Sequence, residues 1–315
     1  MKNERLRFFV RGLVFLAALA LLLTVAERVT VDKNSAAQTL AFYEEPKDSL
    51  DVLFLGSSRV MCGIYPLQLM EEQGIAAFDC AGSAQVIAQS YFQLREALTR
   101  QSPRLVVVEV STVSNGNLLT GDPNFVHAQL DYFRSLPVRM EAIRTLIPKD
   151  DRMEFYFPLL RFHSRVADLD RRDLIPVVDG GKGCIVYEGT TAGAGTPEWV
   201  PPEDKSPVEE IPAEYLRKIV ALCREQGAEV LFLLIPANKP AELQRVHNGA
   251  ADLAEELGVP YLDLRRCVEE MGFDYEQDLY DATHCNSGGA AKVTAYVGEY
   301  LKAHYDLPDR REETK

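Results

Sequence analysis

The sequence predicts an α/β fold in which helices cover both faces of a parallel sheet. Short continuous apolar runs end in glycine, serine or proline, which is typical of strands buried on both faces. Segments with apolar residues at helical spacing alternate with these runs. Such alternation indicates βαβ units, whose parallel strands are joined by helices packed on the sheet.

Five strands and three helices can be placed along the chain. The strands are predicted at 51–55, 76–79, 105–110, 229–235 and 261–264, the second being the weakest. The helices are predicted at 85–100, 212–226 and 287–304, where Gly227 ends the second of them. The last helix has Asn286 or Ser287 as its expected N-cap.

The region between the third and fourth strands is expected to be an insertion. Residues at about 116–210 contain no clear strand; 127–145 have a helical pattern, and 179–212 are rich in glycine and proline. A segment of this length in a compact domain is usually functional. We interpret it as a cap laid over the carboxyl edge of the sheet.

Net charge and cysteine spacing exclude some classes of function for this chain. The chain has 315 residues, with 34 Lys and Arg against 47 Asp and Glu, and a formal net charge of -13. This acidic balance argues against a nucleic-acid partner, which requires a positive surface. Six cysteines occur without C-x-x-C spacing, so neither a metal site nor a cofactor is predicted, and the pairing of the cysteines stays open.

The N-terminus carries a candidate membrane anchor. Residues 8–26 form a stretch of 19 residues, apolar apart from Arg11, and basic residues are denser before it than after it. That length approaches the roughly 20 residues that span a bilayer, and the charge bias places the N-terminus in the cytoplasm. We therefore expect a tail and single-pass anchor at 1–28 in the cell membrane, a stalk at 29–48 and an extracytoplasmic domain at 49–315. A cleaved signal peptide ending near 24–26, or a buried helix of a cytosolic protein, are the alternatives.

Three polar features follow predicted strands or precede the last helix. Gly56-Ser57-Ser58 follows the first strand, Gly82 follows the second, and Asp281-Ala-Thr-His284 precedes the last helix. Ligands of open α/β sheets bind outside the carboxyl ends of the strands. A histidine oriented by a carboxylate can activate a serine hydroxyl, and backbone N–H groups can stabilise the oxyanion that forms. Together the three features favour serine-based acyl chemistry.

With these motifs the chain resembles the SGNH (GDSL-type) hydrolase superfamily over about 51–115 and 228–304. The resemblance implies a three-layer flavodoxin-like fold and makes Ser58 the nucleophile, with Ser57 where the family has aspartate. It implies a triad of Ser58, His284 and Asp281, and oxyanion donors at the backbone of Ser58 and Gly82.

One motif of the family is missing. The family has a Gly-x-Asn-Asp block after the third strand, whose asparagine donates to the oxyanion. Residues 109–115 place no asparagine in register, and Ser111, Thr112 or a displaced Asn115 are the possible substitutes. Loss of one such donor typically costs about 10²–10³ in rate, so either the site is rebuilt or activity is weak or absent.

The chain is more similar to a membrane-anchored subgroup, which includes the alginate acetylation proteins and the D-alanine transfer protein of teichoic acid. The anchor, the Gly-Ser-Ser motif, the missing third block and the large insertion carry this resemblance. It implies extracytoplasmic acyl transfer or ester hydrolysis on a cell-surface glycopolymer, beside a membrane-bound O-acyltransferase. A stand-alone extracellular carbohydrate or lipid esterase is one alternative. A non-catalytic membrane-anchored binding or assembly component with a degenerate triad is another.

Further candidate residues have weaker support. Arg161 and His163, within 160–165, are candidates for holding an anionic sugar or phosphate, since guanidinium groups suit such anions. Asn238, after the fourth strand, and Arg59, after the serine, are candidate substrate contacts. The structural alternative for Arg161 and His163 is a solvated helix face. For Asn238 it is a helix cap, and for Arg59 it is an ion pair with a surface acid. Cys285 is retained as an alternative nucleophile.

Overall fold

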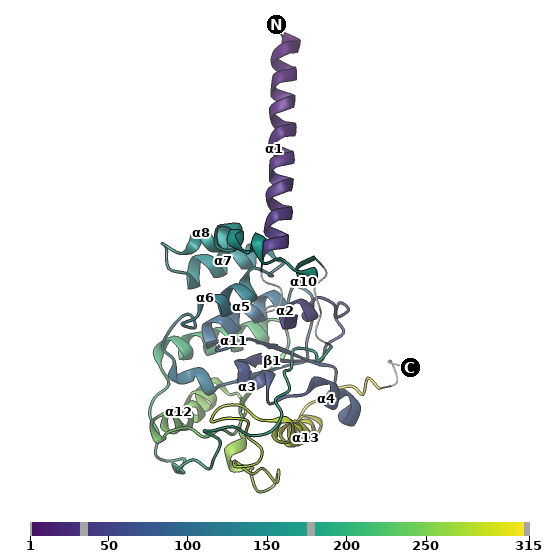
Figure 1. Cartoon of the computed structure of the whole chain (residues 1–315). Helices are drawn as coiled ribbons and strands as arrows, with labels where there is room; N and C mark the ends of the chain where they lie inside the picture. The colour runs from purple at the N-terminus through teal and green to yellow at the C-terminus, as the bar shows by residue number, and fades with distance from the viewer. Residues whose placement is uncertain (1, 32–36, 175–179, 312–315) are drawn as a thin grey trace.

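The computed structural model describes residues 2–31, 37–174 and 180–311, which form a three-layer domain below one long helix (Figure 1). The five strands are all parallel, in the order β2-β1-β3-β4-β5. Their bounds are β1 Val52–Gly56, β2 Ala77–Ala81, β3 Leu105–Glu109, β4 Glu229–Leu234 and β5 Tyr261–Asp263. This is the flavodoxin-like order, so the predicted fold class is confirmed.

Helices bury both faces of the sheet. Side chains alternate along β1, so Leu53 and Leu55 face one layer while Val52 and Phe54 face the other. The first layer contains α5 (Ile87–Ala97), α11 (Glu210–Glu225) and part of α12 (Ala241–Leu257). The second contains α3 (Ser58–Met61), α4 (Pro66–Gln73) and α13 (Ser287–His304). All residues of β1, β2 and β3 are therefore buried, as the continuous apolar runs predict.

Every predicted strand and helix is present within about three residues of its expected bounds. The last helix spans Ser287–His304, and the Asn286 side chain caps it by accepting the Gly289 N–H at 3.1 Å. Helices α4 and α12 are not predicted from the sequence. The buried face of α12 combines polar residues, Gln244, His247 and Asn248, with apolar ones, Ala250, Leu253 and Ala254. The polar residues of this face are satisfied by hydrogen bonds to distant parts of the chain.

The segment expected to be a stalk partly belongs to the domain. Helix α1 spans Lys2–Thr30, and α2 spans Ala37–Phe42; residues 32–36 lie outside the described residues. Phe42 is buried and meets Phe78 of β2 edge to face at 5.4 Å. The neighbouring Tyr43 hydroxyl donates to Glu96 of α5 at 2.8 Å. The segment has too few apolar residues to show a helical pattern in the sequence. Only the folded structure shows that Phe42 and Tyr43 belong to the hydrophobic core.

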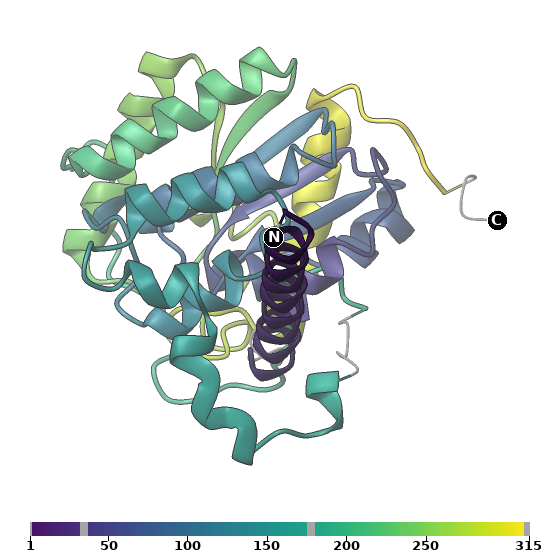
Figure 2. The ribbon, with the colours of Figure 1, turned by 90° about the horizontal axis from the view of Figure 1, so that it is seen from above.

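The insertion is divided between two places. Its first part follows η1 Ser111–Ser114 and comprises α6 Pro123–Leu130, α7 Leu136–Leu146, α8 Arg152–Tyr156, α9 Leu159–Phe162, η2 His163–Ala167 and α10 Arg171–Leu174. Helices α7–α10 lie around the foot of α1, rather than over the carboxyl edge of the sheet (Figures 1 and 2). The return segment, residues 180–209, does reach that edge: the Ile185 N–H donates to Met61 of α3 at 2.6 Å.

Asp79 of β2 is a buried carboxyl without a hydrogen bond to either side-chain oxygen in the described structure. Burial raises its pKa well above the usual 3.8. The folded protein then binds a proton that the unfolded chain has lost. Stability should therefore fall as pH rises from about 4 toward the folded pKa, by at most about 1.4 kcal/mol per pH unit.

We expect Asp79→Asn, which cannot ionise, to raise the melting temperature at neutral pH and to flatten its dependence on pH. Thermal unfolding between pH 5 and 8 measures this, with Asp306→Asn at a fully exposed carboxyl as the matched control. Identical pH slopes in wild type and Asp79→Asn would show that this carboxyl is not held neutral.

Candidate active site

The turn after β1 presents Ser58 at the carboxyl edge of the sheet. Helix α3 begins at Ser58, immediately beyond Gly56, and Ser57 caps it. A Cβ on Gly56 would lie 2.6 Å from Val60 Cγ2 and 2.9 Å from Glu109 Cβ. Only glycine therefore lets the helix start so close to β1 and β3, which fixes where Ser58 stands.

Ser58, His284 and Asp281 form a continuous hydrogen-bonded chain. The Ser58 Oγ lies 2.8 Å from Nε2 of His284, although the two residues are 226 positions apart in sequence. The other ring nitrogen, Nδ1, lies 2.9 Å from Oδ2 and 3.1 Å from Oδ1 of Asp281. This network assigns the proton to Nδ1 and leaves Nε2 to accept from the serine. The structure thus brings together all three predicted triad residues.

The loop before α13 holds Asp281 as an anion. Its Oδ1 accepts the backbone N–H groups of Thr283 at 2.7 Å and His284 at 2.9 Å. Burial works to raise the pKa of Asp281, but the hydrogen bonds from His284 and the backbone outweigh it and hold that pKa below 3.8. A carboxylate in this position stabilises the protonated histidine that forms when the serine loses its proton.

The expected oxyanion donors differ in their availability. The Ser58 N–H opens α3, where helix N–H groups lack partners within the helix. The Gly82 N–H donates to the Gly56 carbonyl at a long 3.3 Å, so it would have to exchange that bond for a substrate oxygen. The Gln129 side chain occupies the space where a Cβ on residue 82 would stand. A side chain at residue 82 would therefore have to displace the Gln129 amide.

The three possible substitutes for the missing asparagine donor are also distinguished. Ser111 Oγ donates to Glu109 at 2.6 Å, and the Asn115 side chain accepts from Asn117. The half-buried Thr112 hydroxyl makes no hydrogen bond within the described part of the chain. Of the two hydroxyls, that of Thr112 is thus the one not already engaged, whereas the bonds of Asn115 occupy its acceptor oxygen and not its NH2 donor.

The Arg59 side chain is buried beneath the turn that carries Ser58 and does not face the space where substrate would bind. It is only 4% exposed; its Nη1 lies 3.7 Å from Glu109 Oε1, and its Nη2 donates to the Ile235 carbonyl. The guanidinium therefore joins α3 to the ends of β3 and β4. Its predicted alternative was an ion pair with a surface acid, but its partner Glu109 is buried because both residues lie under the turn.

The structure places the other candidates in two different regions. Asn238 lies near the site and donates to the Gly193 carbonyl at 3.2 Å, which ties the end of β4 to the return segment. Arg161 instead contacts Glu154 at 3.2 Å and Asn124 at 2.9 Å, in the helical part of the insertion. His163 follows on the same segment, with its ring Nδ1 2.8 Å from the Leu160 carbonyl.

Two residues beside the triad carry little sequence signal. The Tyr187 ring stacks on Tyr280 at 4.5 Å and meets the His284 ring edge to face at 5.8 Å. Lys239 donates to Thr283 at 2.6 Å; burial and the nearby Arg59 lower the pKa of this lysine. The position of Tyr187 in the sequence shows no relation to the triad residues. Tyr187 contacts His284 only because the return segment crosses the carboxyl edge of the sheet. Lys239 could be suspected only from its position after β4.

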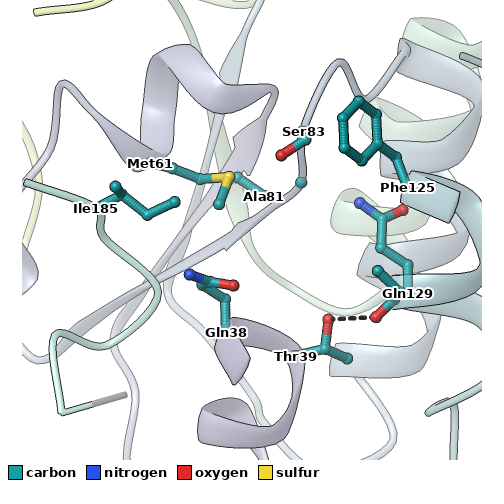
Figure 3. Close-up of a pocket in the computed structure, with 10 residues that line it drawn as sticks. Gln38, Thr39, Met61, Ala81, Ser83, Phe125, Gln129 and Ile185 are labelled. Atoms are coloured by element: carbon teal, nitrogen blue, oxygen red, sulfur yellow. Dashed lines mark hydrogen bonds between the residues drawn. The ribbon is translucent and has the colours of Figure 1, made fainter. Parts of the chain in front are cut away.

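A pocket of about 220 Å³ lies beside Gly82, one of the two expected oxyanion donors, and Asp281, His284 and Ser58 are not among its lining residues (Figure 3). Met61, one turn after Ser58 on α3, lines it together with Gly82 and Ser83 of the turn after β2. The remaining walls come from α2, α6 and the return segment; the residues are Gln38, Thr39, Ala81, Phe125, Ala128, Gln129 and Ile185. This volume and mixed polar and apolar lining suit a small acyl group.

The cysteines do not provide a competing nucleophile. All six are free thiols, and all except Cys267 are buried. Burial raises the pKa of the Cys285 thiol to about 12. A reactive cysteine needs a lowered pKa and access to solvent, so Cys285 is suited to packing rather than catalysis.

Comparison with known proteins finds no matching family model and no matching curated protein. Solved structures do match. They include a protein proposed to be lipolytic, of the G-D-S-L family, from Desulfitobacterium hafniense (11% identity, TM-score 0.41, 79% of this chain and 98% of that one). A protein proposed to be a platelet activating factor from Streptococcus pneumonia matches at 12% identity and TM-score 0.44, over 90% and 99% of the chains. A catalytic mutant of the acetylxylan esterase Axe2 from Geobacillus stearothermophilus matches at 10% identity and TM-score 0.40, over 82% of this chain and 96% of that one. Identity of this level with TM-scores below 0.5 leaves family membership and activity to be judged from the site itself.

Proposed function

We propose that this chain is a membrane-anchored serine enzyme that hydrolyses an ester or transfers its acyl group on a cell-surface glycopolymer. One observation carries the proposal. A continuous hydrogen-bonded chain joins Ser58, which follows the first strand in sequence, to His284 and Asp281, which precede the last helix. The pocket beside Gly82 supplies room for a small acyl group.

The first half-reaction forms an acyl-enzyme. Ser58 Oγ attacks the ester carbonyl carbon while His284 Nε2 takes the hydroxyl proton, and Asp281 stabilises the imidazolium. The carbonyl oxygen becomes an oxyanion, with the Ser58 N–H as its first donor and the Gly82 N–H and Thr112 hydroxyl as further candidates. When this intermediate collapses, the leaving alkoxide takes the proton from His284.

The second half-reaction releases the acyl group. His284 removes a proton from water or from a carbohydrate hydroxyl, whose oxygen attacks the acyl-enzyme carbonyl. Collapse of the second tetrahedral intermediate returns the proton to Ser58. Water yields hydrolysis and a carbohydrate hydroxyl yields transfer, so the acceptor that enters the site decides the outcome.

The location proposed for this chemistry rests on α1. The segment Glu4–Thr30 is long and apolar enough to cross a bilayer, and none of its most apolar window is buried in the protein. An apolar helical stretch that the described part of the protein leaves uncovered is typical of a membrane span. With the basic residues at its N-terminal end, we propose that the catalytic domain lies outside the cytoplasm. A membrane-bound O-acyltransferase is the proposed supplier of acyl groups.

An assay with full-length protein in lipid nanodiscs tests the proposal. We expect p-nitrophenyl acetate to release p-nitrophenol and, when an oligosaccharide is added, acetyl groups to appear on the sugar by mass spectrometry. Hydrolysis that is indifferent to the sugar would favour a stand-alone esterase. A folded protein that releases no p-nitrophenol would contradict an enzymatic role for this protein alone.

One observation favours a second candidate function. The Gly82 N–H is engaged with Gly56, and the usual asparagine donor is missing, so the oxyanion site is less complete than the triad. A chain of this kind can serve as a non-catalytic binding or assembly component. In that case Ser58→Ala would leave both glycopolymer binding and the cellular phenotype unchanged.

A further inference from the structure

Exposed apolar side chains are concentrated in one part of the insertion. Outside α1, the described residues include ten large apolar side chains that are more than a third exposed. Five of these ten fall within residues 153–174, and each of the five is more than half exposed. We call these five the apolar rim: Met153, Phe157, Leu160, Val166 and Leu174. Such a concentration on a water-soluble face is unfavourable unless something covers it.

The apolar rim lies at the foot of α1. Helix α1 packs against α9, η2 and α10, which carry Leu160, Val166 and Leu174. Arg165 Nη1 donates to the carbonyl of Thr30, the last residue of α1, at 2.6 Å. Figure 1 shows these short helices gathered around the point where α1 leaves the domain, and Figure 2 shows them from above.

Helix geometry places this foot at the surface of a bilayer. The apolar stretch 8–26 is 19 residues long, and at about 1.5 Å per residue it spans roughly the 30 Å hydrocarbon core. Only residues 27–30, a little over one turn, separate its end from the contact with Arg165. Elements that pack against this last turn are therefore at the level of the lipid headgroups.

The charge around the apolar rim also suits a lipid surface. Residues 153–174, which contain the apolar rim, have four basic and four acidic residues, a net charge of zero in a chain whose net charge is -13. Two of the acids are already paired: Glu154 with Arg161, and Asp173 with Arg165. A segment that is not acidic can approach an anionic membrane, whereas the rest of this chain would be repelled.

We propose that the apolar rim inserts into the outer surface of the membrane that α1 spans, so that the insertion is a second, interfacial contact with lipid. This rests on the membrane location in the proposed function. Interfacial elements bury apolar side chains at the boundary of headgroups and acyl chains, with basic residues beside them. Two contacts fix the tilt and rotation of the domain on the bilayer, which a single helix does not.

Tryptophan quenching in vesicles tests this directly, because Trp199 is the chain's one tryptophan. In full-length Trp199→Phe, a new tryptophan is introduced at Phe157 or Leu160 in the apolar rim. The matched control is Leu67→Trp on α4, where the side chain is similarly exposed but lies on the opposite layer of the sheet. A fourth variant, Phe15→Trp, reports whether α1 is in the bilayer.

The vesicles contain phosphatidylcholine and phosphatidylglycerol, with or without brominated acyl chains. We expect emission from positions 157 and 160 to fall to roughly half or less with brominated lipid, since interfacial side chains sit about 5–10 Å into the boundary region. Emission from position 67 should not change. Quenching at 157 and 160 but not at 15 would support the interfacial contact and contradict the membrane span.

Three results would overturn the proposal. Quenching at position 15 without quenching at 157 and 160 would leave the span standing but show that the apolar rim is not in lipid. Blue-shifted but unquenched emission from 157 and 160 would show that protein, such as a second copy of this chain, covers the rim. Equal quenching at 67 would indicate adsorption of the whole domain and would equally contradict a specific contact.

Discussion

Ser58→Ala is expected to reduce ester turnover by about 10⁴-fold or more, because alanine leaves no group to form the acyl-enzyme. Ser58 is half-buried at the first position of α3, and only its hydroxyl is removed, so the melting temperature should change little. Release of p-nitrophenol by full-length protein in nanodiscs measures the loss.

The neighbouring serine provides a close control. Ser57 is buried and caps α3 by accepting the Arg59 N–H at 3.4 Å, without contact to His284. Ser57→Ala should cost about 1 kcal/mol of stability, the typical value of an N-cap, and keep most of the activity. Activity that survives Ser58→Ala but not Ser57→Ala would place the nucleophile one residue earlier than we propose.

Asp281→Asn is expected to lower turnover by about 10⁴-fold while leaving the loop folded. An asparagine oxygen can still accept the backbone N–H groups of Thr283 and His284, which hold the loop. Its NH2 group then stands where Oδ2 was and donates to Nδ1 of His284, so the histidine takes the other tautomer and can no longer accept the Ser58 proton. Steady-state kinetics, together with the melting temperature, separate these two effects.

The matched control is Asp274→Asn, an exposed carboxylate in the segment just before this loop. It should keep full activity. Comparisons belong at neutral pH: because folding lowers the pKa of Asp281, its contribution to stability is present above about pH 3.8 and is lost as the pH falls below that. Equal activity of Asp281→Asn and wild type would remove Asp281 from the proposed mechanism.

The features that the sequence predicts well are those with local causes. Continuous apolar runs specify strands buried on both faces, and all five are found in the expected order. Asn286 caps α13 as predicted, because a cap depends only on the residues around it. Local patterns place Ser57-Ser58 after the first strand and Asp281 with His284 before the last helix, whereas the choice of Ser58 over Ser57 follows from the resemblance to the SGNH superfamily.

Features that depend on distant packing could not be predicted. Arg59 reads in sequence as a possible substrate contact, and only the arrangement of β1 and β3 buries it against Glu109. Phe42 lies in a segment whose composition is typical of a linker, and only its contact with Phe78 of β2 shows that it is a core residue. Tyr187 reaches His284 because the return segment crosses the sheet edge, and nothing in the order of residues specifies that crossing.

The activation of Ser58 by His284 is the central claim, and fluorophosphonate labelling of the full-length protein tests it most directly. We predict a single adduct, located on Ser58 by mass spectrometry, that is retained in Ser57→Ala and lost in Ser58→Ala and His284→Ala. No adduct in folded wild-type protein, or an adduct on another residue, would contradict the claim.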